Sequence, residues 1–448
     1  MQLKKTSIRN KLAIATSTLL LSSPIQAAET ATLVENSENS PVKNNEDNFA
    51  ISGLYYSEND RVDVKKIHSK ITKQLNEDHI LRTDLIYDTM SGASPNGRIF
   101  TDNATSESIT ITTASGFAFD ATNTTNAASN KTWLTEFEDT RKAINLEWEY
   151  KASRTITTSL GVGTSHEDDY ESYTASGNVV FEFNQKRSSL NIGAAIANDT
   201  IKAGGGIPEG LGVLTCNNVP SFHPDWLDCD TEPKFFKPAE KIVTDYIIGL
   251  TQIWDRRTVI QINYGFGKED GYLTDPYKQV SVVKASYGES AVLYEKRPDT
   301  RNTNSLFFKF VNVPFNQLAL NFSYRYFWDD WDVRAHTADG RLRIKLSDRV
   351  YIQGHGRLHR QSAASFFDKQ ISADNNSPNY YFEKPNYLSA DSRLSKLIGA
   401  TAGVKVGVKI DDDIDVSARV EHMQQHYYGG ILPRMKVWIA QLILNMKF

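Results

Sequence analysis

The chain has 448 residues, a formal net charge of −4 and a polar mean hydropathy of −0.44. The excess of acidic residues, with no Lys/Arg-rich run in the body of the chain, argues against a nucleic-acid partner. No window after residue 30 approaches the roughly 18 consecutive apolar residues that a membrane-spanning helix needs. The chain is therefore either soluble or a membrane protein that crosses with strands.

Residues 1–27 have the three parts of a secretory signal peptide. Four basic residues and no acidic residue lie in the first eleven positions, an apolar run follows at 12–21, and a small-residue site ends at Ala27 or Ala28. Removing those four positive charges from the net −4 would leave about −8. Residues 28–48, rich in Asn, Glu and Ser, are predicted to form a periplasmic leader or a short plug.

From residue 49 onward, apolar and polar residues alternate with a period of two, which is typical of strands with two different faces. The clearest examples, in chain order, are residues 144–150, 260–266, 318–328, 400–410 and 416–420. The last segment, 437–448, alternates in the same way and ends on Phe448. Its ending resembles the recognition signal that the outer-membrane barrel-assembly machinery reads.

Short polar turns alternate with longer loops, which is the pattern of an outer-membrane barrel. The turns lie at 76–78, 152–154, 184–186, 255–257, 313–315, 347–349 and 411–413. The loops lie at about 89–138, 199–239, 267–301 and 364–392, with shorter ones near 165–169, 329–334 and 427–434. Seven turns join fourteen strands, the C-terminal strand is the fifteenth, and residues 49–56 supply the sixteenth.

We therefore expect an all-β protein, a transmembrane antiparallel up-and-down β-barrel of about 16 strands over residues 49–448. Both termini would lie in the periplasm of a Gram-negative cell. The expected contacts are outer-membrane lipid and lipopolysaccharide, together with the assembly machinery during biogenesis.

A barrel of this size encloses more volume than inward side chains fill, so a channel or a ligand cavity is expected. The predicted lumen charges are mixed in sign, which favours a wall of mutually compensating charges over a selectivity ring of one sign. They are Arg82, Asp84, Asp88, Glu147, Glu149, Asp245, Lys309, Arg325, Arg357, Lys405, Lys409, Arg419 and Glu421.

Residues 351–361 are denser in titratable groups, with His355, Arg357 and His359 all predicted on one face. Two histidines four residues apart on a strand stand about 13 Å apart, too far to share a metal. We interpret the segment as a polar lumen stripe, with a substrate-contact site as the alternative.

Cys216 and Cys229 fall in the longest central loop, and an even cysteine count in an oxidising compartment favours a disulfide. The alternative is a metal site that uses His223, Asp225 and Asp228 between them. There is no Cys-x-x-Cys-His for a c-type haem and no motif of a hydrolase or a P-loop. We expect no cofactor, no metal and no enzymatic activity, and an outer-membrane hydrolase is the weakest alternative.

Four stretches, in this order, resemble domain-of-unknown-function family 3570, a group of predicted bacterial outer-membrane barrels. They are residues 87–97 (YDTMSGASPNG), 273–278 (LTDPYK), 294–301 (YEKRPDTR) and 324–331 (YRYFWDDW), the last followed by His336 and Thr337. The resemblance implies the barrel fold and brings no activity. Family members are encoded beside extracytosolic redox or flavin-attachment proteins, an association rather than a mechanism. The loop at 199–239 matches none of these motifs.

These motifs place charged residues at the predicted rim of the barrel. Arg–carboxylate pairs there would lock the loops into a clasp. The alternative is a constriction or docking surface for a small anionic solute or a partner. The residues are Asp88, Arg297, Asp299, Arg301, Arg325, Asp329 and Asp330.

The function that follows is a porin-like channel for small solutes. The alternative is a non-conducting barrel that acts as a scaffold for a periplasmic or lipoprotein partner, in an extracytosolic redox system.

Overall fold

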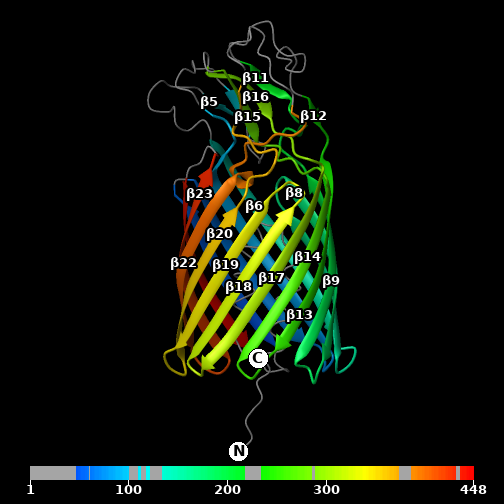
Figure 1. Cartoon of the computed structure of the whole chain (residues 1–448), viewed down its shortest axis with the longest axis vertical. Coiled ribbons are helices and arrows are strands. Elements are labelled where there is room, and N and C mark those ends of the chain that lie inside the picture. The colour runs from blue at the N-terminus through cyan, green and yellow to red at the C-terminus, as the bar shows by residue number, and fades with distance from the viewer. Residues whose placement is uncertain are drawn as a thin grey trace, which may run out of the picture.

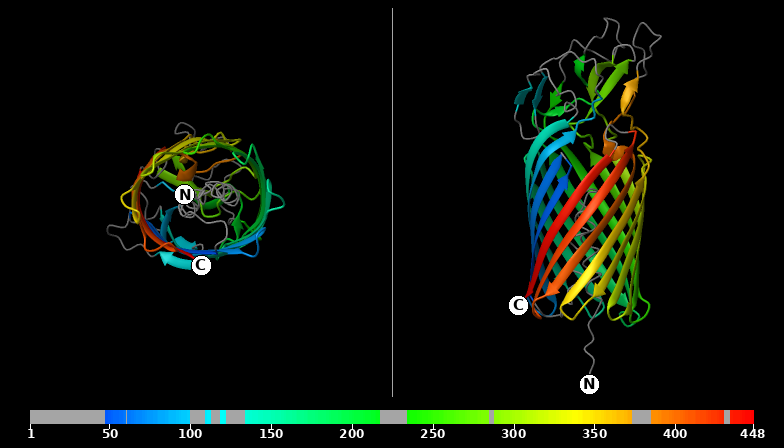
Figure 2. Two further views of the ribbon diagram at one scale, coloured as in Figure 1. Left: turned by 90° about the horizontal axis from the view of Figure 1, so that it is seen from below. Right: turned by 90° about the vertical axis from the view of Figure 1, so that its left-hand side faces the viewer.

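The computed structural model describes residues 47–59, 61–99, 134–216, 234–284, 288–372, 385–429 and 434–448, and the backbone of 109–112 and 118–121. The predicted signal peptide and nearly all of the predicted leader lie outside these residues. Sixteen strands form one closed antiparallel barrel, as the alternation of the sequence predicts (Figures 1 and 2).

The barrel strands follow each other around the wall in chain order. They are β1 (Asn48–Glu58), β2 (Val62–Gln74), β3 (His79–Pro95), β6 (Leu134–Tyr150), β7 (Ile156–His166), β8 (Tyr170–Phe183), β9 (Ser188–Ile201), β13 (Ala239–Ile253), β14 (Thr258–Gly271), β17 (Thr300–Phe315), β18 (Leu318–Asp329), β19 (Arg334–Lys345), β20 (Val350–Gln361), β22 (Lys396–Lys409), β23 (Ile414–Tyr428) and β24 (Arg434–Lys447).

The first and last strands close the barrel. β1 pairs with β24 along its whole length, from Asn48 opposite Lys447 to Glu58 opposite Val437. Closure leaves the barrel no unpaired strand edge, which membrane-spanning strands require because lipid offers no hydrogen bonds. Both described ends of the chain lie at the end of the barrel that carries the short turns.

The outer face of the barrel is apolar. Outward side chains such as Leu160, Val162 and Leu358 are more than half exposed, while their neighbours in sequence point inward. Large aromatic residues lie toward both edges of this apolar belt, as in membrane barrels. At the short-turn end these include Trp148, Phe183, Trp254, Phe315 and Phe448, and toward the other end Tyr55, Tyr173, Tyr428 and Trp438.

One predicted turn is wrong. Residues 313–315 belong to β17, and the turn falls at residues 316–317. The pairing of β17 with β18 shifts between Asn312 and Phe315. Pro314 lacks an N–H for a regular ladder, and a local irregularity accommodates it.

The long loops contain sheets of their own. β11 (Val213–Cys216), β16 (Gly288–Tyr294), β15 (Gln279–Lys284) and β21 (Gln370–Ser372) pair in that order, with β15 and β21 parallel. Val280, Val282 and Leu293 are fully buried in this sheet. We call this sheet and the segments packed on it, residues 272–284, 288–299 and 385–395, the cap; it stands over the long-loop end of the barrel (Figure 1).

Smaller elements accompany the cap. Two-stranded sheets are formed by β4 (Ile109–Thr112) with β5 (Ala118–Ala121) and by β10 (Ile207–Pro208) with β12 (Phe235–Phe236), and η2 (Ser392–Leu394) is a short 3-10 helix. Among the described residues, no helix is long and apolar enough to cross a membrane.

Candidate functional site

Five charged side chains join the segments of the cap in one network, which we call the clasp. Arg297 lies between two carboxylates, with Nε 2.7 Å from Glu295 Oε1 and Nη2 2.9 Å from Asp391 Oδ2. Arg393 donates to Asp391 at 2.7 Å and to Asp275 at 2.7 Å. Burial alone would raise the pKa of Asp391, but the nearby guanidinium groups hold that pKa well below its usual range.

The turn of residues 94–97 (SPNG) packs against the cap. Lys278 Nζ donates to the carbonyl of Pro95 at 2.6 Å, and the amide of Gln279 donates to the carbonyl of Asn96 at 2.7 Å. Gly97 has a φ of +101°, and a Cβ there would lie 2.1 Å from the carbonyl oxygen of Gln279. This position needs glycine for its conformation and for the close approach of the backbone.

A second ion pair fixes the loop between β18 and β19. Arg301 donates twice to Asp329 Oδ2, at 2.6 and 2.9 Å, and its guanidinium lies 4.4 Å from the ring centre of Trp331. Asp329 Oδ1 accepts from the amide of Trp331 at 3.1 Å. Asp330 accepts from the amide and the side chain of Asn302 at 3.0 and 2.8 Å.

The remaining rim residues lie apart from these networks. Asp88 is buried in the barrel wall and accepts twice from Arg141, at 3.0 and 2.8 Å. Asp299 is exposed, and its backbone carbonyl accepts from the amide of Gly271. Arg325 lies four residues below the end of β18, about 13 Å down the wall at a strand's rise per residue. The structure thus places Arg325 inside the barrel and the clasp residues above it.

His355 bridges three strands of the lumen wall. Its Nε2 lies 2.8 Å from Asp339 Oδ2 on β19, and its Nδ1 lies 2.7 Å from Glu421 Oε1 on β23. Gly403 stands between His355 and Glu421 in the register, and a Cβ there would lie 2.3 Å from Cγ of Glu421. The glycine therefore leaves the space in which the two side chains meet.

Arg357 and His359 lie on the same inward face of β20, above His355. His359 Nδ1 lies 2.9 Å from Thr337 Oγ1. Arg325 of β18 lies near these two residues. The charge of Arg357 acts on Arg325, and the charges of both arginines act on His359. Within the described part of the chain, no carboxylate forms an ion pair with Arg325 or Arg357.

The lumen charges are segregated around the wall. On β17–β23 basic groups outnumber acidic ones, while on β6–β14 acidic groups outnumber basic ones. The inward charges of β17–β23 are Arg301, Lys309, Arg325, Arg341, Arg343, Lys345, Arg357, Lys405, Lys409 and Arg419, against Asp329, Asp339, Asp415 and Glu421. Those of β6–β14 are Asp139, Glu147, Glu149, Glu182, Asp199, Asp245 and Glu269, against Arg141 and Lys241.

The order of strands sets these two arcs across the lumen from each other. β6 and β19 stand eight places apart in the closed order of sixteen. Glu147 and Glu149 of β6 are both paired with Arg82, at 2.6 and 2.9 Å. The sequence predicts a mixed wall, and the segregation becomes apparent only when the strands are placed around the barrel.

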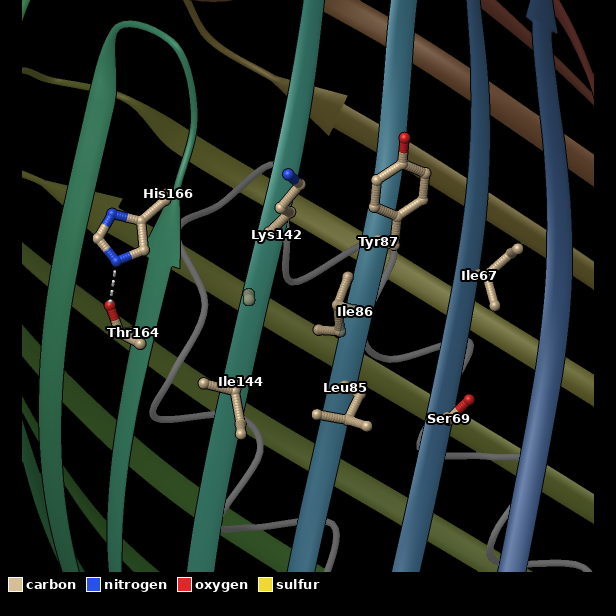
Figure 3. A pocket seen from close by; sticks show the side chains of 10 residues that line it. Ile67, Ser69, Leu85, Ile86, Tyr87, Lys142, Ile144, Thr164 and His166 are labelled. Atoms are coloured by element: carbon tan, nitrogen blue, oxygen red, sulfur yellow. Dashed lines mark hydrogen bonds between the residues drawn. The ribbon is translucent and has the colours of Figure 1, made fainter.

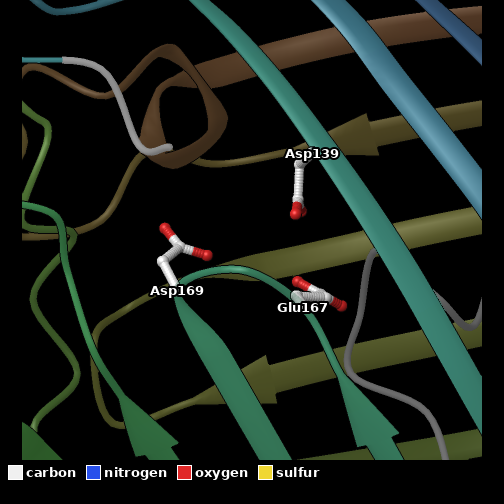
Figure 4. Close-up of side chains that lie close together, drawn as sticks. All are labelled: Asp139, Glu167 and Asp169. Carbon is white, nitrogen blue, oxygen red and sulfur yellow. The ribbon is translucent and has the colours of Figure 1, made fainter. Parts of the chain in front are cut away.

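Three carboxylates meet at the long-loop end (Figure 4). One oxygen from each of Asp139, Glu167 and Asp169 lies within 4.8 Å of the others, a donor set that suits a hard cation. Burial, reinforced by the charge of Asp139, raises the pKa of Glu167 to about 7. Asp169 accepts a hydrogen bond from the hydroxyl of Tyr277 at 2.9 Å.

A shallow pocket of about 400 Å³ lies on the outer face of the barrel, between β2, β3, β6 and β7 (Figure 3). Leu85, Tyr87 and Ile144 line it, with Lys142 and His166 at its upper edge. Because its lining belongs to the apolar belt, this pocket faces the membrane and not the lumen.

Cys216 ends β11 and packs against the core of the cap. Cys229, like His223, Asp225 and Asp228, lies outside the described residues. The disulfide between the two cysteines stays a prediction.

The closed barrel, the apolar belt and the polar lumen define a membrane-spanning β-barrel of the outer-membrane type. More narrowly, the chain belongs to the family described as protein of unknown function DUF3570, whose sequence profile matches residues 10–442. This match confirms the resemblance carried by the four motifs.

No curated protein sequence matches the chain. Among solved structures, a ferric enterobactin receptor of Pseudomonas aeruginosa is 12% identical with a TM-score of 0.39 over 85% of this chain, and a monoaromatic hydrocarbon channel is 8% identical with a TM-score of 0.39 over 90% of it. A bacterial polysaccharide outer membrane secretin is 8% identical with a TM-score of 0.44 over 91% of this chain and 99% of the secretin. The chain spans about half the length of the receptor (53%) and 88% of the hydrocarbon channel.

Proposed function

We propose that this chain is a porin-like channel for small solutes in the outer membrane. The observation that carries the proposal is the contrast between the two faces of the barrel. The outer face is an apolar belt, whereas the inner face carries ionisable side chains from β2 to β23. Charged side chains facing a lumen are typical of barrels that pass water and solutes. The proposal includes no catalytic step.

In this proposal the long-loop end faces the cell exterior, and both described ends of the chain face the periplasm. Long extracellular loops and short periplasmic turns are the usual orientation of such barrels. The apolar belt would contact outer-membrane lipid, and the upper edge of the barrel would contact lipopolysaccharide. The terminal strand with Phe448 would engage the assembly machinery during biogenesis.

The cap favours a second candidate, a non-conducting barrel that serves as a scaffold for a periplasmic or lipoprotein partner. Its sheet has a dry core, with Val280, Val282 and Leu293 fully buried, and the clasp holds its segments together. A cap of this stability at the mouth of the barrel would restrict passage. A partner would then be bound at the short-turn end.

Single-channel recording of the purified, refolded mature protein in a planar bilayer separates the two candidates. A heat-modifiable shift on denaturing gels shows first that the barrel has folded. We expect discrete, reproducible conductance steps that heat-denatured protein in the same detergent does not give. A folded barrel that gives no conductance steps would contradict the channel and favour the scaffold. Crosslinking in outer membranes would then test the scaffold.

The same recording tests the predicted disulfide. Adding reductant should change gating if Cys216 and Cys229 are joined and their loop lies near the mouth. The Cys216→Ser/Cys229→Ser variant is the matched control, because reductant should no longer affect it. Alkylation of the unreduced protein followed by mass measurement shows independently whether the thiols are paired.

A further inference from the structure

We infer that the lumen wall carries an oxyanion-binding site formed by Arg325, Arg357 and His359, which takes a small solute bearing a carboxylate or phosphate group. The inference deepens the proposed channel function, on which it rests, by naming the class of solute. The three side chains come from β18 and β20, below the cap and on the inward face.

The register brings the three side chains to one patch of the wall. Arg325 stands opposite Thr337, and Thr337 stands opposite His359, so Arg325 and His359 lie two strands apart. That separation is about 10 Å between backbones, which arginine side chains can span. Arg357 lies two residues from His359 on the same face.

The charges of this patch lack the partners that other arginines of the barrel have. Arg82, Arg141 and Arg301 each lie within 3 Å of a carboxylate oxygen. By contrast, Nε of Arg325 is buried and has no hydrogen-bond partner, and no carboxylate in the described ranges pairs with Arg325 or Arg357. A buried charge without a partner is costly, and a bound anion would remove that cost.

The neighbouring polar groups do not compete with an anion. Asp339 stands opposite Arg357 in the register, but its oxygens lie 2.8 Å from His355 and 3.3 Å from Arg341. Thr337 and His359, which lie 2.9 Å from each other, add polar groups that can donate hydrogen bonds. The patch therefore offers two cations and further donors on one part of the lumen wall.

The chemistry of guanidinium selects the ligand class. Its planar fork of N–H donors matches the two oxygens of a carboxylate or a phosphate, which a single halide ion does not reproduce. Phe327 presents its ring to Arg325, whose guanidinium lies 5.4 Å from the ring centre, and this contact restricts where that guanidinium can point. Since the site faces the lumen, its ligand is a free solute and not a lipid headgroup.

The surrounding field supports the same assignment. The site lies in the arc β17–β23, where cations outnumber carboxylates, while the arc β6–β14 is predominantly acidic. A transverse separation of charge draws anions to one side of a pore and cations to the other. An anion that follows the basic arc would meet Arg325 and Arg357 below the cap.

The test uses the full mature protein and the Arg325→Gln/Arg357→Gln variant in planar bilayers, with inorganic phosphate and acetate as probes. Arg256→Gln, an exposed arginine in a short turn, is the control. In a KCl gradient the wild type and the control should prefer anions, and phosphate should reduce their current at concentrations that leave the double variant unaffected. The anion preference of the double variant should fall several-fold.

Calorimetry measures phosphate binding to the detergent-solubilised barrel, and so tests the anion site independently of conductance. If the barrel binds phosphate but does not conduct, the channel proposal is contradicted and the anion-site proposal is retained. Conductance with the same selectivity and phosphate response in the double variant would overturn the site. If the double variant fails to show the heat-modifiable shift, Arg357→Gln alone replaces it. A wild type that binds neither phosphate nor acetate overturns the site without any variant.

Discussion

The arginines of the cap and those of the lumen wall occupy opposite situations. Arg297 lies between two buried carboxylates and completes a closed network. Arg325 and Arg357 face the lumen beside each other with no carboxylate pair in the described residues. Paired, buried charges hold a structure together, while unpaired charges beside a space are available to a ligand. The comparison separates the clasp as architecture from the lumen wall as the candidate site.

The largest expected effect concerns the clasp. Arg297→Gln leaves Glu295 buried without its counter-charge and removes one of the two arginines that pair with Asp391, which should destabilise the cap by about 3–5 kcal/mol. Hydrogen exchange should show faster exchange in β15 and β16, while the heat-modifiable shift of the barrel is retained. Asp299→Asn, two residues away and exposed, should change neither the hydrogen exchange of β15 and β16 nor the heat-modifiable shift. Unchanged exchange in Arg297→Gln would mean that the clasp does not hold the cap.

A smaller loss of stability is expected at the turn of residues 94–97, which packs against the cap. Gly97→Ala places a Cβ 2.1 Å from the carbonyl of Gln279 at a φ of +101°. The strained backbone costs about 1–3 kcal/mol, and the clash adds to it. Gly205→Ala is the matched control, since its φ is +86° but nothing lies within 4 Å of a Cβ. Protease cleavage near residues 94–99 should rise for Gly97→Ala more than for Gly205→Ala near its own site.

The acidic group at the rim predicts a dependence on pH. The pKa of Glu167 is raised from 4.5 to about 7, so the folded loop binds a proton more tightly than the unfolded loop does. Stability of this loop should therefore be full below about pH 4.5 and should fall as the pH rises towards 7. Local hydrogen exchange in residues 167–169 should show this fall. Glu167→Gln should reduce it, and the part that remains belongs to Asp169, whose pKa burial also raises; a fall of unchanged size would contradict the assignment to Glu167.

The smallest effect is expected on the acidic arc. Asp245 faces the lumen from β13, and Asp245→Asn removes one negative charge. If the protein conducts, its anion preference should rise slightly, and its stability should stay within about 0.5 kcal/mol. Reversal potentials in a KCl gradient measure the first effect and urea unfolding the second. A shift towards cations would contradict the assigned polarity of the two arcs.

The barrel could be predicted from the sequence because apolar residues facing the membrane alternate with polar residues facing the lumen along each strand. The strand count followed from the alternation of short and long connections. Pro314 was misassigned because a proline normally indicates a turn, whereas β17 accommodates it through a shift of register.

The candidate site could be predicted only in part. Arg297, Arg301 and Asp329 were expected at the rim in Arg–carboxylate pairs, and Arg301 does pair with Asp329, but Asp391, which pairs with Arg297, comes from a segment far away in sequence. No local pattern encodes such pairing. Arg325 was expected both among the lumen charges and with the rim residues, and it lies on the lumen wall. The charge segregation was missed because it depends on which strands face each other across the lumen.

The seam between β1 and β24 has a consequence for biogenesis. Its partners, such as Asn48 and Lys447, lie far apart in sequence, so this contact cannot form until β24 has been synthesised. A truncated chain would display two open sheet edges, which invite pairing with other chains. The barrel therefore closes only when β24 is present. A chain without β24 would stay open between β1 and β23 and would be exposed to aggregation and proteolysis.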